Sequence, residues 1–302
     1  MISHLIGLVL AASPVAPPMP DSEPITVTAP RIDPATVAPA ARAYVKGVLP
    51  TPVSGQYARW LGPVCIKVIG LEAPLADRIS SRITVIARES RVPVAAAGCQ
   101  PNLVVWFSGD ARRDVAAILG KKPLSGKDIS AENRRRLLDA PLPVRWWHTV
   151  QAGSSDGTGM STTPSAKSTA QFIGSDNAGT GVGGPTASST ATYSSSLIDT
   201  HLSVGIVYAA AAVDVPLTQG QTLESVANYV AMVTLAPIPL DVAAPAVPSI
   251  LGLFAAAPTA AETQLSPWDK AYLAALYRMS PNRRASSQKG QLVAAIPKTL
   301  KP

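Results

Sequence analysis

Apolar residues recur with the spacing of helices or strands in several separate stretches of the 302-residue chain. In QTLESVANYVAMVTL (221–235) the i, i+3, i+4, i+7 spacing places these apolar side chains on one helix face: Leu223, Val226, Ala227, Val230 and Val233. Thr222 is placed to cap this helix, and Glu224 puts negative charge in its first turn, where the helix dipole favours it. We therefore expect a buried helix over these residues.

A β–α–β–α order is expected in the first apolar block of the chain. The runs at 64–70 and 103–108 are bounded by Gly and Pro, as buried strands are. Between them, APLADRISSRITVIARES has Pro74 in a first-turn position. Its helical spacing places these side chains on one face: Leu75, Ile79, Ile83 and Ile86. Asp110 is placed to cap a further short helix, and the two strands are expected to be parallel neighbours.

Two later runs predict an antiparallel pair of strands. LPVRWWHTV (142–150) alternates between polar and apolar residues, and residues 198–215 read either as one long strand or as two with a break near Gly205. Between them, residues 152–196 are dominated by Ser, Thr, Gly and Ala. Such a stretch buries too little apolar surface to offset its ordering entropy, so a disordered insertion is expected at the tip of the pair.

The helix with the clearest start and end signals is expected near the C-terminus. In LSPWDKAYLAALYRMSPNRR, Ser266 and Asp269 match a capping box, Pro267 takes the first helical position, and Arg278 suits the last turn. The expected core contacts of this helix are Tyr272, Leu273, Leu276 and Tyr277.

Together these stretches predict an α+β fold in which helices pack on a twisted mixed sheet. Order is expected to begin near Ala40 with a short helix. The expected segments are a signal peptide (1–16), a Pro-rich tether (17–41), the α+β domain (42–235) containing the insertion, a Pro/Ala-rich linker (236–262) and a C-terminal helical segment with a basic tail that packs on the domain (263–302).

The N-terminus is typical of a short secretory signal. The apolar run from Leu5 to Ala12 is too short to span a bilayer as a helix, and small residues follow it, with Ala11 and Ala16 as alternative cleavage sites. This pattern predicts a periplasmic or secreted protein, and no later segment has the length and hydropathy of a membrane span. The run is preceded by no Lys or Arg, which keeps a cytosolic protein with reduced cysteines as the alternative.

Export gives the two cysteines a structural interpretation. Cys65 and Cys99 are an even pair, which in an oxidising compartment indicates a disulfide. The alternative is a catalytic thiol, but AAAGCQPN offers Cys99 no histidine nearby to lower its pKa.

The net charge of +7 is concentrated in two segments, 112–136 and 268–302. Basic segments suit acidic glycan, anionic lipid or nucleic acid, although they are also ordinary on solvated surfaces. Aromatic residues that would stack on bases do not alternate with the basic ones, which disfavours nucleic acid. We expect an envelope partner, protein or glycan, with Arg283, Arg284 and Lys289 as a candidate contact surface.

Few residues in the chain suit catalysis. His148 and His201 flank the insertion, and with Asp199 they are a candidate zinc site, although hydrogen-bonded or exposed strand histidines are the simpler interpretation. GSSDG and GTGVGG match a nucleophile elbow and a dinucleotide loop only formally, since neither is followed by the helix that such a motif needs. We expect no cofactor.

Four stretches, QYARWLGPVCIKVIGL, GCQPNLVVWF, ANYVAMVTLAPI and DKAYLAALYRMSPNRRASSQKG, resemble a group of exported bacterial proteins of unknown function. The order of elements is also similar to a secreted bacterial domain related to zinc metallopeptidases, in which a helix carries H-E-x-x-H. The resemblance implies that residues 221–235 are that helix. Its motif positions here are Ala227, Asn228 and Ala231, none of which ligates zinc or accepts a proton.

Two functions remain open from the sequence. The first is a non-catalytic exported envelope protein, a binding or structural module on a degenerate peptidase-like scaffold. The alternative is a metal-dependent hydrolase with an atypical site around His148 and His201.

Overall fold

A computed structural model describes residues 34–121, 129–154, 200, 202–255 and 263–300 of the chain. Its strands are β1 (Arg59–Trp60), β2 (Ile66–Ile69), β3 (Leu103–Ser108), β4 (Val144–Ser154) and β5 (Leu202–Asp214). Its α-helices are α1 (Pro34–Val48), α2 (Ala73–Glu89), α3 (Ala111–Lys121), α4 (Ala131–Asp139), α6 (Leu223–Leu235), α7 (Pro267–Arg278) and α8 (Ala285–Thr299). Two 3-10 helices, η2 (Val215–Thr218) and η3 (Ile250–Gly252), complete the described elements.

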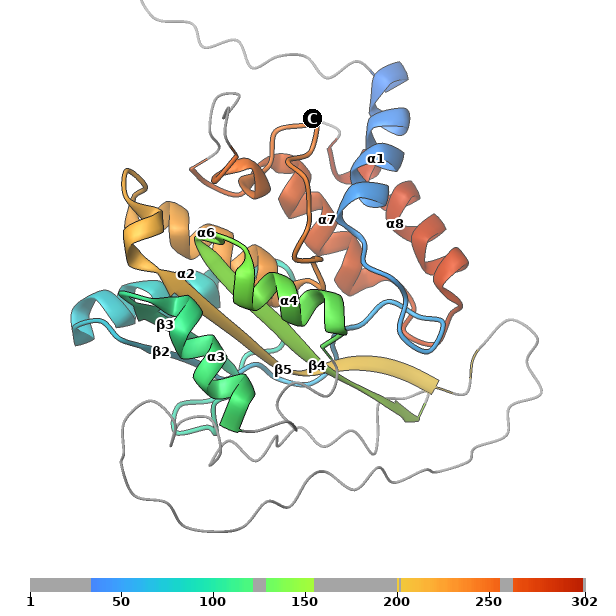
Figure 1. Cartoon of the computed structure of the whole chain (residues 1–302). Coiled ribbons are helices and arrows are strands. Elements are labelled where there is room, and N and C mark those ends of the chain that lie inside the picture. Colours follow the sequence, from blue (N-terminus) through green and yellow to red (C-terminus); the bar gives the residue numbers. More distant parts are fainter. Residues whose placement is uncertain (1–33, 122–128, 155–199, 201, 256–262, 301–302) are drawn as a thin grey trace, which may run out of the picture. The chain divides into compact units, whose positions relative to one another are not determined.

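The longest strand, β5, holds the mixed sheet together (Figure 1). One of its edges pairs with β4 in antiparallel register along the length of β4, from Val144 to Ser154. Its other edge pairs in parallel first with β1 and then with β3. The strand β2 lies parallel to β3, with Ile66 opposite Leu103, which confirms the expected parallel neighbours.

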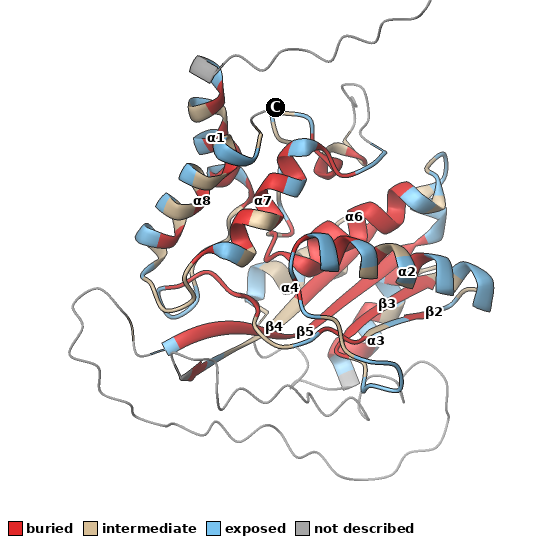
Figure 2. Cartoon of the chain, turned by 180° about the vertical axis from the view of Figure 1, so that it is seen from behind, coloured by how far each residue is buried: buried red, intermediate tan, exposed pale blue. Residues whose placement is uncertain are grey.

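Helices cover both faces of this sheet, which explains why β3 and most of β5 are buried on both sides. Because side chains alternate along β4, Trp146 and His148 share one face, and Arg145 and Trp147 share the other. The Trp146 ring packs against Tyr229 of α6, and Arg145 reaches the main chain of α4. Thus α2 and α6 lie on one face, and α3 and α4 lie on the other (Figures 1 and 2).

The helix α2 follows the spacing expected from its sequence, except in its first turn. Ile79, Ile83 and Ile86 on the predicted face are buried, whereas Leu75, near the start of the helix, is 39% exposed. Gly70, at the end of β2, has a φ of +81°, and a Cβ there would lie 2.1 Å from the Phe107 carbonyl oxygen. Glycine is therefore required where the chain leaves the sheet for α2.

The helix α6 is almost entirely enclosed, with each residue from Ser225 to Leu235 buried. As expected, the Thr222 side chain caps it by accepting a hydrogen bond from the Ser225 amide. At its other end, the Trp60 indole donates to the Thr234 carbonyl at 3.0 Å, and the Tyr277 hydroxyl donates to the Leu235 carbonyl. Side chains thus satisfy helix-end carbonyls that are shielded from water.

Two buried arginines also donate hydrogen bonds to main-chain carbonyls at the ends of other helices. Arg145 donates to carbonyls at and after the end of α4: Leu137 at 3.0 Å, Ala140 at 2.8 Å and Leu142 at 2.6 Å. Arg59 donates to the Leu276 carbonyl of α7 at 2.8 Å and to the Met279 carbonyl that follows it. Burial lowers the pKa of Arg59 to about 10, so this guanidinium stays charged at neutral pH.

Two segments differ from the expected organisation. The first helix begins at Pro34 rather than near Ala40, so residues 34–41 belong to α1 and not to the tether. Residues 236–255, expected as part of a linker, pack into the core through these side chains: Ala236, Ile238, Leu240, Ile250, Leu251 and Leu253. Apolar residues between the prolines explain this packing, whereas composition alone indicated a linker.

The C-terminal helices pack against α1 and carry a buried carboxylate. The capping box of Ser266 and Asp269 at the start of α7 is confirmed. Asp269 also accepts hydrogen bonds from the Tyr44 hydroxyl at 2.8 Å, the Ser249 hydroxyl at 2.6 Å and the Ile250 amide at 2.8 Å. This one side chain therefore joins α1, η3 and α7.

The antiparallel pair is longer than expected on the β4 side. Residues 152–154 continue β4 as strand, and β5 is a single strand through Gly205. The remainder of the expected insertion lies outside the described residues, as do the expected signal peptide and most of the expected tether. Within the described part of the chain, none of the helices has the length and apolarity that crossing a membrane requires.

Candidate functional site

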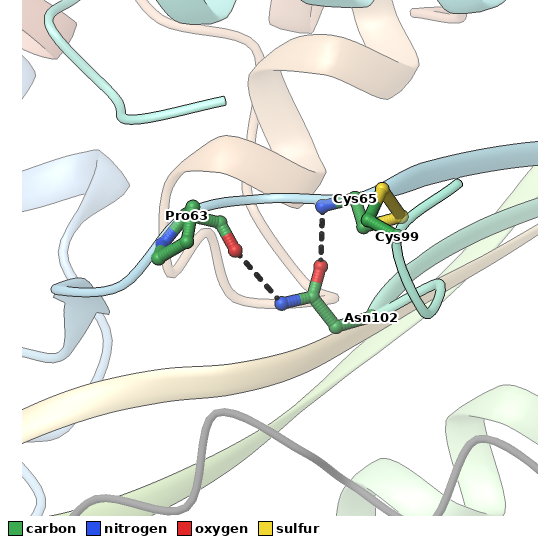
Figure 3. The surroundings of a disulfide bond; sticks show 4 residues. All are labelled: Pro63, Cys65, Cys99 and Asn102. Carbon is green, nitrogen blue, oxygen red and sulfur yellow. Dashed lines mark hydrogen bonds between the residues drawn. A yellow bond between two sulfur atoms is a disulfide. The ribbon is translucent and has the colours of Figure 1, made fainter. Parts of the chain in front are cut away.

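Cys65 and Cys99 form the predicted disulfide, with their Cα atoms 6.0 Å apart (Figure 3). Beside it, the Asn102 side chain accepts from the Cys65 amide at 2.7 Å and donates to the Pro63 carbonyl at 3.0 Å. The disulfide and Asn102 therefore fasten the entry to β2 onto the entry to β3. A thiol nucleophile is excluded while this bond is intact.

The carboxyl ends of β3 and β5 meet where open α/β sheets commonly bind ligands. The chain leaves β3 for α3 on one face and leaves β5 for α6 on the other, which is the arrangement that open α/β sheets use for ligand binding. Here two carboxylates at the strand ends bond to main-chain amides of the protein itself. Asp214 accepts from the Ala111 amide at 3.2 Å, and Asp110 accepts from the Arg113 amide at 2.9 Å. The positive end of α3 is thus already matched by two carboxylates.

His148 lies against the C-terminal turns of α6. Burial lowers its pKa to about 4, and the main chain of Thr234 and Val233 opposes that shift only in part. Its Nε2 atom is shielded from solvent and has no hydrogen-bond partner among the described residues. The ring is therefore neutral at pH 7.

The strand register gives no support to a metal site shared by the two histidines. His148 lies opposite Ala209, whereas Leu202 lies opposite Ser154. The two β5 residues are separated by about 23 Å at the usual rise of roughly 3.3 Å per residue. Asp199 and His201 themselves lie outside the described residues, and within the described ranges no three His, Cys, Asp or Glu side chains gather as metal ligands do.

The polar residue in the middle of α6, Asn228, takes part in bridging hydrogen bonds. Its Oδ1 accepts from Nε of Arg82 on α2 at 2.7 Å, and its Nδ2 donates to the Thr263 carbonyl before α7 at 2.8 Å. Asn228 itself is fully buried, but its two bonds are only partly shielded from water, because Arg82 is half-buried and Thr263 is exposed. Asn228 therefore links an arginine of α2 to the segment that precedes α7.

That arginine lines a groove of about 230 Å³ between α2 and α6, the α2–α6 groove. Its walls are Arg78, Ile79, Ser81, Arg82 and Val85 from α2, and Leu223, Glu224 and Ala227 from α6. Within the described residues, no carboxylate lies within 4.0 Å of Arg78 or Arg82. The groove therefore offers two available cations, one carboxylate and an apolar floor.

The basic residues expected to form a contact surface lie at the start of α8. Arg284 is exposed, and Arg283 and Lys289 are partly buried. Within the described part of the chain, these three residues do not line the α2–α6 groove and have no buried polar atom without a partner. The contact surface therefore stays a prediction.

Sequence reasoning did not single out Arg78 and Arg82. Their only signal in the sequence is a spacing of four on the polar edge of the helix expected there, which places them one turn apart. Their approach to Glu224 and Asn228 depends on the packing of α2 against α6, which residues so distant in sequence do not reveal.

Comparison of the chain with protein-family models, curated proteins and solved structures finds no match.

Proposed function

We propose that the protein is an exported, non-catalytic binding module whose ligand occupies the α2–α6 groove. The observation that carries this proposal is the bond between Arg82 and Asn228. It makes α6 a wall that positions a cation, which is a binding role and needs neither a metal nor a proton acceptor on the helix. A rigid first contact of this kind suits recognition, because little side-chain freedom is lost on binding.

Two further features support the proposal. At the carboxyl edge of the sheet, Asp110 and Asp214 accept hydrogen bonds from amides in the first turn of α3. Polar groups that often bind ligands at this edge of such sheets therefore stabilise the fold here. The Cys65–Cys99 disulfide supports export, because disulfides persist in oxidising compartments.

Export is tested by cell fractionation and thiol labelling of the full chain. We expect the mature protein in the periplasm or medium, with both cysteines resistant to alkylation until a reductant is added. Recovery in the cytosol with two reactive thiols would contradict the proposed compartment.

Binding is tested by immobilising the oxidised protein and capturing ligand from envelope extract in the presence of a chelator. We expect capture by the wild type, loss of capture with Arg82→Glu, and retention with Arg88→Glu, an exposed position on the same helix that does not line the groove. Equal capture by both variants would reject the groove. Stoichiometric zinc that is lost on His148→Ala or His201→Ala would favour the hydrolase instead.

A further inference from the structure

The α2–α6 groove combines three features that match one end of a peptide. We propose that it binds the carboxyl-terminal residue of a peptide chain whose last side chain is apolar. This inference rests on the proposed function, because it names the ligand class of the same groove.

The cationic wall is suited to a carboxylate. Arg78 and Arg82 lie one helical turn apart on α2, and both line the groove. Asn228 holds Nε of Arg82, and the second bond of Asn228 to Thr263 fixes the orientation of the amide. This bond restrains the planar guanidinium, and its terminal amino groups have no hydrogen-bond partner among the described residues. A fixed arginine fork binds carboxylates through two parallel hydrogen bonds.

The opposite wall disfavours a ligand that is only anionic. Glu224 lines the same groove from the first turn of α6. Its negative charge would repel a phosphate or a second carboxylate, but it accepts a hydrogen bond from an N–H donor. A peptide terminus carries both partners, a carboxylate for the arginines and a main-chain N–H for Glu224, on the same residue.

The floor and the size of the groove complete the match. Ile79, Val85, Leu223 and Ala227 supply apolar surface, and Val85 is 43% exposed although it belongs to the wall of a groove. The volume of about 230 Å³ is smaller than the range of about 300–1,000 Å³ found for pockets that enclose drug-sized ligands. A chain end with one apolar side chain fits such a site better than an internal segment or a sugar polymer does.

The test is fluorescence polarisation of the full-length oxidised protein with fluorescein-labelled Gly-Gly-Leu. We expect the free acid to bind and the C-terminal amide of the same peptide to bind at least about tenfold more weakly, since a charged hydrogen bond is lost. Arg82→Gln should weaken binding of the free acid to a similar extent. The matched control, Arg88→Gln, removes the same charge from the same helix outside the groove and should leave the affinity unchanged.

A second pair of measurements identifies the role of Glu224. Glu224→Gln should weaken Gly-Gly-Leu, because a neutral amide oxygen accepts the peptide N–H less strongly than a carboxylate does. The same change should strengthen competition by inorganic phosphate, because the repulsion between the two negative charges is removed. The proposal is overturned if the amide binds as well as the free acid, if Arg88→Gln loses as much affinity as Arg82→Gln, or if phosphate competes equally with wild type and Glu224→Gln. Capture from envelope extract that depends on Arg82, without binding of the peptide, would reject this ligand and leave the proposed function standing.

Discussion

Buried charged side chains in this protein are matched mainly by main-chain groups. Arg59 and Arg145 donate to helix-end carbonyls, and Asp269 accepts from two amides as well as two hydroxyls. Such bonds offset the cost of removing a charge from water, which is large when no partner is supplied. Among the described residues, His148 is the one histidine, and its Nε2 atom has no such bond.

The buried ring of His148 predicts a loss of stability in mild acid. Its pKa is about 4 in the folded protein and near its ordinary value of about 6.5 in the unfolded chain, so the unfolded chain binds the proton more tightly. The contribution of the neutral ring is complete above pH 6.5 and is lost as the pH falls towards 4. Between pH 7.5 and pH 5, the free energy of unfolding should fall by about 2 kcal/mol from this residue.

Urea denaturation of the wild type and His148→Gln at both pH values measures this effect. Other titrating groups act in both proteins, so the difference between the two pH dependences isolates His148. We expect the variant to lose about 2 kcal/mol less than the wild type over this range. Identical pH dependences would show that water reaches the ring in solution.

At the scale of elements, local pattern predicted the helices better than their contacts. The spacing of isoleucines in α2, the cap at Thr222 and the capping box of α7 each depend on residues within a few positions of one another, and each is present. Asp269 was expected only as a cap. Its bond to Tyr44 joins residues 225 positions apart, and no local pattern indicates such a contact.

Asp269 forms the joint between α1, η3 and α7, so replacing one of its carboxylate oxygens should reduce stability strongly. The Asp269 carboxylate accepts four hydrogen bonds, two from the Ile250 and Ser266 amides and two from the Tyr44 and Ser249 hydroxyls. In Asp269→Asn the amide nitrogen cannot accept a hydrogen bond, so at least one of these four donors loses its acceptor. We expect a loss of about 2–4 kcal/mol in the free energy of unfolding, as for a buried charged hydrogen-bond network. Tyr44→Phe removes one donor and should cost only about 1 kcal/mol.

Chemical denaturation of both variants tests the joint, and the exchange of amide hydrogens in α1 locates the effect. The expected pattern is greater exchange in α1 for both variants and a lower unfolding midpoint for Asp269→Asn. If Asp269→Asn were as stable as Tyr44→Phe, the carboxylate would be no more than the cap that the sequence predicts.

At the scale of the whole molecule, the sheet order could be predicted only in part. The parallel pairing of β2 with β3 and the antiparallel pairing of β4 with β5 follow from chain order and connection length. The pairing of β5 with both β1 and β3 does not, because a two-residue strand carries no periodicity. The α2–α6 groove depends on the packing of α2 against α6, so the local sequence shows its arginines but does not show its shape.

The disulfide and Asn102 both connect the segment that precedes β2 to the segment that precedes β3. We therefore expect each to strengthen the effect of the other. Replacing Cys65 and Cys99 by serine should cost about 3–4 kcal/mol, from the entropy of a loop whose ends are 34 positions apart. Asn102→Ala leaves the Cys65 amide and the Pro63 carbonyl without this partner, at a cost of about 1–3 kcal/mol.

A double-mutant cycle on these positions separates two effects of the disulfide. If the bond acted only by restricting the unfolded chain, the cost of Asn102→Ala would be the same with and without it. Because the bond also holds Cys65 beside Asn102 in the folded protein, we expect the cost to differ by about 0.5–3 kcal/mol between the two backgrounds. Urea denaturation of the four proteins without reductant measures the coupling, and strict additivity would assign the disulfide to the unfolded state alone.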